Sequence, residues 1–220
     1  MKKIHILLAL TLCICLCGCF SFNPKNNSEG LDSEEVVDDP QDDAATAKNT
    51  HLKFKGVPID GALETFVTRM KHKGFKYEGS TEDGYEVLTG EFAGSKNCSI
   101  YVATLDNQDL VSRIYVKFPE RERWEYLYGE YEELKKMLTE KYGKPSSCTE
   151  KFLTFSTKTD SDKMRAVDFG ECKYESCFNV NNGEIVLWIE HEGFSTCYVM
   201  LLYKDKANTT TVRRHAKDDL

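Results

Sequence analysis

The sequence predicts an α+β domain in which helices pack on an antiparallel sheet. Two observations predict this class: amphipathic helical segments alternate with groups of short strands, and Asn182-Gly183 separates two alternating runs as in a β-hairpin. The order helix, then several antiparallel strands, occurs twice, over about 51–118 and 119–204. We therefore expect a tandem repeat of one helix-strand unit, forming a curved antiparallel sheet with two helices on one face. Two unrelated α+β halves are the alternative.

Apolar residues at helical spacing mark the two predicted helices. The first runs from Asp60, a favourable N-cap, to Gly74. The second begins after Pro119 and ends in Tyr142-Gly143-Lys144-Pro145, a glycine cap followed by a proline. Their apolar faces carry Leu63, Phe66, Val67 and Met70 in the first helix, and Trp124, Leu127, Tyr131, Leu134 and Leu138 in the second.

Short runs rich in β-branched and aromatic residues predict strands after each helix. After the first helix they cover residues 75–78, 85–92, 98–104 and 111–118, and after the second 152–156, 166–169, 174–180, 185–191 and 197–203.

Alternation along these strands predicts which side chains face away from the helices. If Ile100, Val102, Ile114, Val116, Leu187, Ile189, Val199 and Leu201 form the core, the other face carries Tyr101, Tyr115, Trp188 and Tyr198. Aromatic side chains on a rigid sheet offer contact area at a low entropy cost, so these four are candidate ligand-binding residues for a protein, peptide or glycan. The alternatives are that the N-terminal segment, the C-terminal tail or a second copy in a homodimer covers this face.

The N-terminus has the pattern of an export signal. Met1-Lys2-Lys3 precedes an apolar run over 4–16 that is too short for a spanning helix. The run ends in Leu16-Cys17-Gly18-Cys19, which resembles the lipobox of bacterial lipoproteins. The resemblance implies a signal peptide over 1–18, cleavage before Cys19, and lipid attachment to Cys19 by fatty acyl groups such as palmitate. An ordinary secretory signal is the alternative.

The segment after Cys19 is acidic. Residues 20–50 hold eight acids against two lysines, a net charge of −6. Few large apolar residues accompany them, so we expect residues 19–50 to be a disordered tether. A polar C-terminal tail is expected over 205–220.

Charge and motifs exclude several functions. Outside the signal and tether the chain is nearly neutral, with 28 acids and 25 bases and no basic stripe, so no nucleic-acid partner is expected. Gly-x-Ser-x-Gly, His-Glu-x-x-His, phosphate-loop and dinucleotide motifs are absent, so neither an enzyme nor a cofactor is expected. Glu190 and Glu192 share a strand face and could mimic a glycosidase pair, which keeps a hydrolase as an alternative.

Five cysteines follow Cys19: Cys98, Cys148, Cys172, Cys177 and Cys197. An exported protein meets oxidising chemistry, so one or two disulfides are expected, with Cys172 near Cys177 in sequence and Cys98 and Cys197 at similar places in the two units. A zinc site from Cys172, Cys177 and His191 matches no ligand spacing, so no metal is expected.

Two resemblances add to this interpretation. The order of elements is similar to the tandem helix-sheet fold of β-lactamase inhibitory protein and of small outer-membrane assembly lipoproteins, which bind proteins. The segment Phe54-Lys55-Gly56-Val57-Pro58-Ile59-Asp60-Gly61, with Phe92-Ala93-Gly94 and Tyr142-Gly143-Lys144-Pro145, resembles uncharacterised lipoproteins of Bacteroides-type gut bacteria. The second implies a lipid-anchored place in the cell envelope, at the outer membrane, and no activity.

Together these observations predict a lipid-anchored envelope protein that acts as a binding or assembly module. A structural lipoprotein that dimerises through its sheet face is the alternative. No acidic run directly follows Cys19, which favours the periplasmic side over the cell surface.

Overall fold

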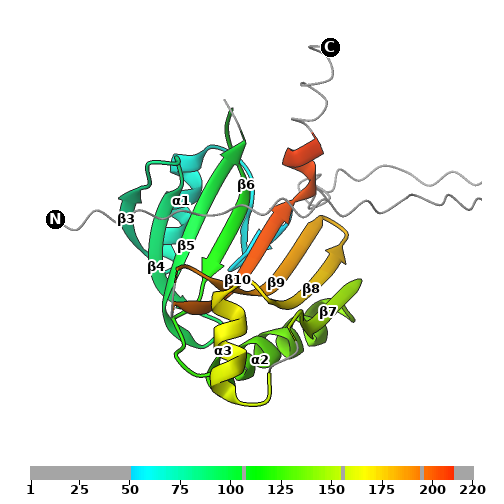
Figure 1. Cartoon of the computed structure of the whole chain (residues 1–220). Coiled ribbons are helices and arrows are strands. Elements are labelled where there is room, and N and C mark those ends of the chain that lie inside the picture. The colour runs from blue at the N-terminus through cyan, green and yellow to red at the C-terminus, as the bar shows by residue number, and fades with distance from the viewer. Residues whose placement is uncertain (1–50, 106–107, 155–156, 194–195, 211–220) are drawn as a thin grey trace, which may run out of the picture. The chain divides into compact units, whose positions relative to one another are not determined.

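A computed structural model describes residues 51–105, 108–154, 157–193 and 196–210. The predicted signal peptide, Cys19 and the acidic tether lie outside these residues, as does the tail over 211–220. The described chain is α+β, as predicted, and is built on an eight-stranded antiparallel sheet (Figure 1). None of the helices in this part is long and apolar enough to span a membrane.

The elements are, in chain order, β1 (Lys53–Phe54), β2 (Val57–Pro58), α1 (Leu63–His72), β3 (Lys76–Ser80), β4 (Glu86–Phe92), β5 (Ser95–Leu105), β6 (Gln108–Lys117), α2 (Trp124–Tyr142), β7 (Ser147–Phe152), α3 (Asp160–Asp168), β8 (Cys172–Val180), β9 (Gly183–His191) and β10 (Cys197–Asp205). Residues 206–210 are helical.

The sheet joins two groups of four strands. Its order is β3-β4-β5-β6-β10-β9-β8-β7, so the last strand of each group meets the other at the centre. Figure 1 shows the green β6 beside the orange-red β10. Their register pairs Tyr115 with Leu202 and Lys117 with Met200. Each group follows a helix, and the second group also contains α3 between β7 and β8.

The start of α1 differs from the prediction. Asp60 is not the N-cap, because the helix begins at Leu63 after Ala62, whose side chain makes no capping hydrogen bond. The Leu63 N–H donates instead to Asp109 Oδ1 of β6 at 3.0 Å, while Asp60 accepts from Arg69 at 2.7 Å. A carboxylate distant in sequence therefore satisfies this helix end. The end predicted at Gly74 is confirmed, since Gly74 has φ +90° and its N–H donates to Lys71.

A third helix occupies a segment that the sequence pattern assigned to a strand. Residues 166–169 were predicted as a strand, but Ala166 and Val167 are buried residues of α3. The helix starts in a capping box: Thr159 Oγ1 accepts from the Asp162 N–H, and Asp162 accepts from the Thr159 N–H, both at 3.1 Å. The strand predicted at 152–156 is likewise displaced, because β7 ends at Phe152.

The predicted hairpin is confirmed between β8 and β9. Val180 pairs with Gly183, so Asn181 and Asn182 form the turn. Gly183 lies against the neighbouring strand, where a Cβ atom would come within 2.2 Å of the Lys204 carbonyl oxygen. Only glycine allows this close backbone approach without a shift.

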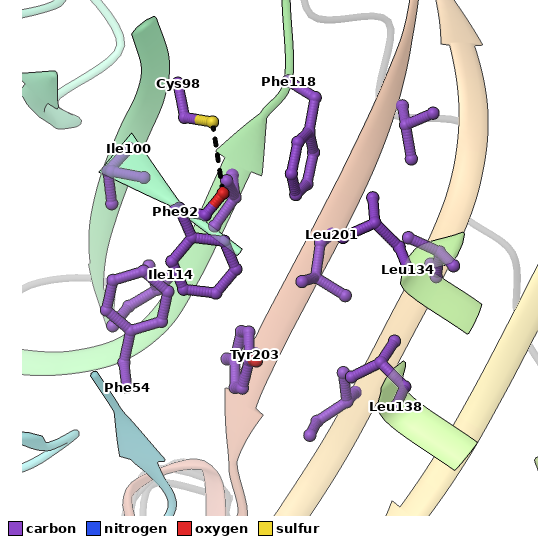
Figure 2. Close-up of a cluster of buried hydrophobic side chains, with 14 of the residues drawn as sticks. Phe54, Phe92, Cys98, Ile100, Ile114, Phe118, Leu134, Leu138, Leu201 and Tyr203 are labelled. Carbon is purple, nitrogen blue, oxygen red and sulfur yellow. Dashed lines mark hydrogen bonds between the residues drawn. The ribbon is translucent and has the colours of Figure 1, made fainter. Parts of the chain in front are cut away.

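One hydrophobic core lies between the sheet and the three helices. Figure 2 shows side chains from β1, β5, β6, α2 and β10 converging on it. The Phe54 ring stacks on Phe92 at 4.9 Å between centroids and meets the edge of Tyr203 at 5.3 Å. Each predicted core residue, from Ile100 in β5 to Leu201 in β10, is buried here. We call this side of the sheet the helix-covered face.

Both ends of the described chain meet at Asp205, the last residue of β10. Its buried carboxylate accepts from the Leu52 N–H at 2.7 Å, from His51 Nδ1 at 3.1 Å and from the Asn208 N–H at 2.9 Å. Asn208 in turn donates to the carbonyl groups of Ile59 and Val111. The boundary expected at residue 204 therefore lies inside the fold.

Candidate binding face

The four predicted binding residues come together on the helix-free side of the sheet. Tyr115 and Tyr198 are buried in a cluster with Ala103 and Met200, and Tyr101 and Trp188 pack against it. Tyr85 and Leu202 complete the cluster. We call these eight residues the aromatic face.

Strand register explains why residues so distant in sequence are neighbours. One row across the sheet runs Val87, Tyr101, Tyr115, Leu202, Val186, from β4 to β9. The next row runs Ser99, Lys117, Met200, Trp188, Glu175, from β5 to β8. Directly opposed residues in antiparallel strands point to the same face, so each row forms one continuous strip of side chains.

The aromatic rings of this face differ in how far they are buried. Tyr115 is 8% exposed and Tyr198 3% exposed, whereas Tyr101 and Trp188 are half-buried. The Tyr85 ring meets Tyr115 edge-on at 6.0 Å between centroids, a contact that the sequence pattern did not predict. Tyr101 and Trp188 therefore pack against buried neighbours on the same face and remain partly accessible to a partner.

A lysine lies at one end of this face. The Lys117 ammonium lies 4.2 Å from the centre of the Tyr198 ring and donates to Glu192 at 3.0 Å and Glu120 at 3.3 Å. Burial disfavours its charge, but the hydrogen bond and charge of Glu192 outweigh burial and raise the pKa of Lys117. Burial raises the pKa of both Tyr101 and Tyr198, so both phenols stay protonated at neutral pH.

The two carboxylates considered as a glycosidase pair have different partners. Glu190 accepts from the Trp188 indole N–H at 2.9 Å and from the His191 N–H at 3.0 Å. Glu192 accepts from Lys117 instead. Glu190 therefore orients the indole, while Glu192 helps to hold the lysine.

No disulfide joins any of the five described cysteines, so the expected disulfides do not form in this structure. Cys98 and Cys197 lie in β5 and β10, which β6 separates. Cys172 packs against the helix-covered core, whereas Cys177, five residues along the same strand, points to the other face. Burial raises the pKa of Cys98 to about 11 and those of Cys172 and Cys197 to about 12.

The three residues weighed as zinc ligands are not brought together, because Cys172 and Cys177 point to opposite faces of β8. Across the part of the chain that the structure describes, no three His, Cys, Asp or Glu side chains are grouped to hold a metal ion.

A polar network that the sequence did not reveal joins α2 to the sheet edge. The buried Tyr131 hydroxyl lies 2.7 Å from Ser176 Oγ and donates to Glu150 at 3.2 Å. Glu150 also accepts from Lys135 and, at 3.3 Å, from the exposed Cys148 thiol. Burial opposes ionisation of this carboxyl, but hydrogen bonds from Lys135 and Cys148 outweigh burial and lower the pKa of Glu150.

A shallow hollow of about 370 Å³ lies between α1 and the sheet edge. Two of its three carboxylates already have partners: Asp109 accepts from the Leu63 N–H, and Glu86 accepts from Tyr77 and Ser80. None of the four predicted binding residues lines it. Its lining residues are Leu63, Glu64, Val67, Thr68, Lys71, Tyr77, Glu86 and Asp109.

Comparison with known proteins identifies no family for this chain. No protein-family model matches it, and neither the curated proteins nor the solved structures compared with it give a significant match. Its function must therefore be argued from the aromatic face itself.

Proposed function

We propose that this chain is a lipid-anchored protein of the bacterial cell envelope, a non-enzymatic binding or assembly module that docks a protein partner on its aromatic face. The supporting observation is the packing of that face: half-buried Tyr101 and Trp188 pack against a cluster that contains the buried Tyr115 and Tyr198. Preorganised aromatic side chains lose little entropy on binding and are enriched among the residues that dominate protein interfaces.

The size of the face favours a transient partner over a permanent homodimer. The aromatic face reaches from Tyr85, just before β4, to Trp188 of β9, about 20 Å across the sheet, and it extends about 14 Å along the strands, by standard strand spacings. That amounts to a few hundred Å², as on binding patches of monomers, whereas a stable dimer buries about 800 Å² per partner.

We also propose that the two halves are copies of one helix-strand unit. In each half, a helix precedes four strands that are neighbours in the sheet. The last strand of each half, β6 or β10, pairs with the other at the centre of the sheet. Duplication would thus produce a sheet whose two halves both contribute to the aromatic face.

Metabolic labelling tests the anchor. Cells that express the full chain are fed a palmitate analogue, and we expect labelled protein from the wild type and from the Cys17→Ser variant. The Cys19→Ser variant should carry no label. Label that persists in Cys19→Ser would rule out this attachment site.

Site-specific photo-crosslinking tests the docking face. A photoreactive phenylalanine analogue replaces Tyr101 in the full chain, or Tyr126 of α2, which is 55% exposed and serves as the matched control. We expect one discrete crosslinked band from position 101 only, which Trp188→Ala removes and Trp188→Phe retains. A band with twice the mass of the chain would establish the homodimer instead, and identical bands from both positions would refute the docking face.

A further inference from the structure

Carboxylates gather at the end of the aromatic face where Trp188 lies. Glu175 is directly opposite Trp188 in the β8–β9 register, and Glu190 accepts the indole N–H. Glu192 and Glu120 flank Lys117, which lies in the same row as Trp188, two strands away.

The basic groups here do not balance these acids. Lys117 is 17% exposed and already shared by two carboxylates. Arg121 is bound by Glu130 of α2 at 2.9 and 3.1 Å. Even with Lys173 of β8 and Lys151 of β7, which lie opposite each other on this face, the four carboxylates outnumber the three ammonium groups. This end of the face is therefore complementary to positive charge.

The molecule itself shows how such a site holds a cation. Lys117 rests over the Tyr198 ring with carboxylates beside it. Trp188 has the same surroundings, an aromatic ring flanked by Glu175 and Glu190, yet none of the lysines and arginines that the structure describes lies over its ring. Indole is the ring that binds cations best, and a hydrogen bond from its N–H to a carboxylate makes it more electron-rich.

We propose that the partner docks with a basic polypeptide segment, and that one of its arginine side chains stacks on Trp188 between Glu175 and Glu190. A guanidinium suits this site better than an ammonium, because its flat surface stacks on the indole while its edge donates to carboxylates. Apolar residues next to that arginine would contact the half-buried Leu202 and Tyr101. This inference rests on the proposed function and specifies the chemistry of the partner.

Two synthetic hexapeptides test the inference with the purified full-length chain. One alternates arginine and leucine, and the other replaces each arginine by citrulline, which keeps the shape but is neutral. Isothermal titration calorimetry, a readout that does not depend on Trp188, should show roughly tenfold tighter binding of the arginine peptide, as a cation–ring contact and flanking carboxylates predict. The difference should shrink as salt is raised.

Variants locate the effect. Trp188→Ala, and separately the double change Glu175→Gln with Glu190→Gln, should remove the preference for arginine. Glu184→Gln is the matched control, because Glu184 lies on the same face at its other end, beside Lys204. Equal loss in Glu184→Gln would reveal general charge attraction and overturn the site.

The other outcomes separate this inference from the proposed function. Equal binding of both peptides, or binding of neither, would overturn a cationic partner but leave a positive crosslink at position 101 to stand. A failed crosslink would overturn the docking face itself. Peptide binding that depends on Trp188 and the two carboxylates supports the basic partner.

Discussion

The two faces of this sheet carry similar residues but differ in what covers them. On the helix-covered face, Phe54 is fully buried between Phe92 and Tyr203, beneath elements of the same chain. On the aromatic face, the described chain lays nothing but neighbouring side chains over Tyr115 and Tyr198, and it leaves Trp188 half-exposed. Aromatic content alone therefore does not identify a hydrophobic core. What distinguishes the two faces is whether helices of the same chain cover the aromatic side chains.

Truncation of Phe54 should give the largest effect. Phe54→Ala removes a fully buried ring from the helix-covered face and should cost about 3–5 kcal/mol of unfolding free energy. Urea denaturation of the full-length chain measures this. Leu153→Ala, at a residue 58% exposed, is the control and should stay within about 0.5 kcal/mol of the wild type. A similar loss in both variants would contradict the assignment of the core.

The polar network on the helix-covered face should give an intermediate effect. Tyr131→Phe removes one hydroxyl and leaves Ser176 Oγ without its closest partner in the buried network, which should cost about 1–2 kcal/mol. The same denaturation experiment on Tyr128→Phe, whose hydroxyl belongs to a less buried ring, should show a smaller loss. If the two losses are equal, the network contributes nothing specific.

Trp188→Ala should change stability less than either of these, by about 1 kcal/mol or less, because the side chain is only half-buried. Far-UV circular dichroism and the denaturation midpoint give the comparison. A loss as large as that of Phe54→Ala would show that this residue is structural, and the contrast between the two faces would fail.

The smallest effect should be a change in pH dependence. Since the pKa of Glu150 is lowered in the folded state, its contribution is complete above the unfolded value, about 4.3, and is lost as the pH falls through the folded value. Glu150→Gln should therefore flatten the loss of stability below about pH 5. Glu133→Gln, which changes an exposed glutamate of α2, should leave the acid limb unchanged. An unchanged acid limb in Glu150→Gln would show that this carboxylate does not contribute.

Alternation made the two faces predictable from sequence. Tyr101, Tyr115, Trp188 and Tyr198 were assigned to one side because side chains alternate along a strand, and no bulge falls between these residues and their core neighbours. The pairing of β6 with β10, which brings Tyr115 beside Leu202, has no local signal in either strand.

The N-cap predicted at Asp60 and the strand predicted at 166–169 are wrong for one physical reason. Contacts between residues distant in sequence outweigh the preference of the local sequence. The Asp60 side chain could cap a helix, but in the folded structure it is Asp109 that accepts the Leu63 N–H at the start of α1. Residues 166–169 look like a strand in isolation, and the capping box seven residues earlier, with aspartate in place of the usual glutamate, is a weak pattern. The Tyr131–Ser176–Glu150 network depends on three elements whose packing no short window contains.

The central place of β10 has a consequence for the order in which the protein can be completed. β10 is the last of the described strands along the chain and is synthesised after the others, yet it pairs with β6 and provides Asp205, which accepts a hydrogen bond from Leu52 at the start of the domain. Until it arrives, β6 has an unpaired edge, and an open strand edge invites pairing with other chains. The nascent chain therefore passes through a period in which its first half is vulnerable to aggregation, and that period ends only when the final strand is inserted.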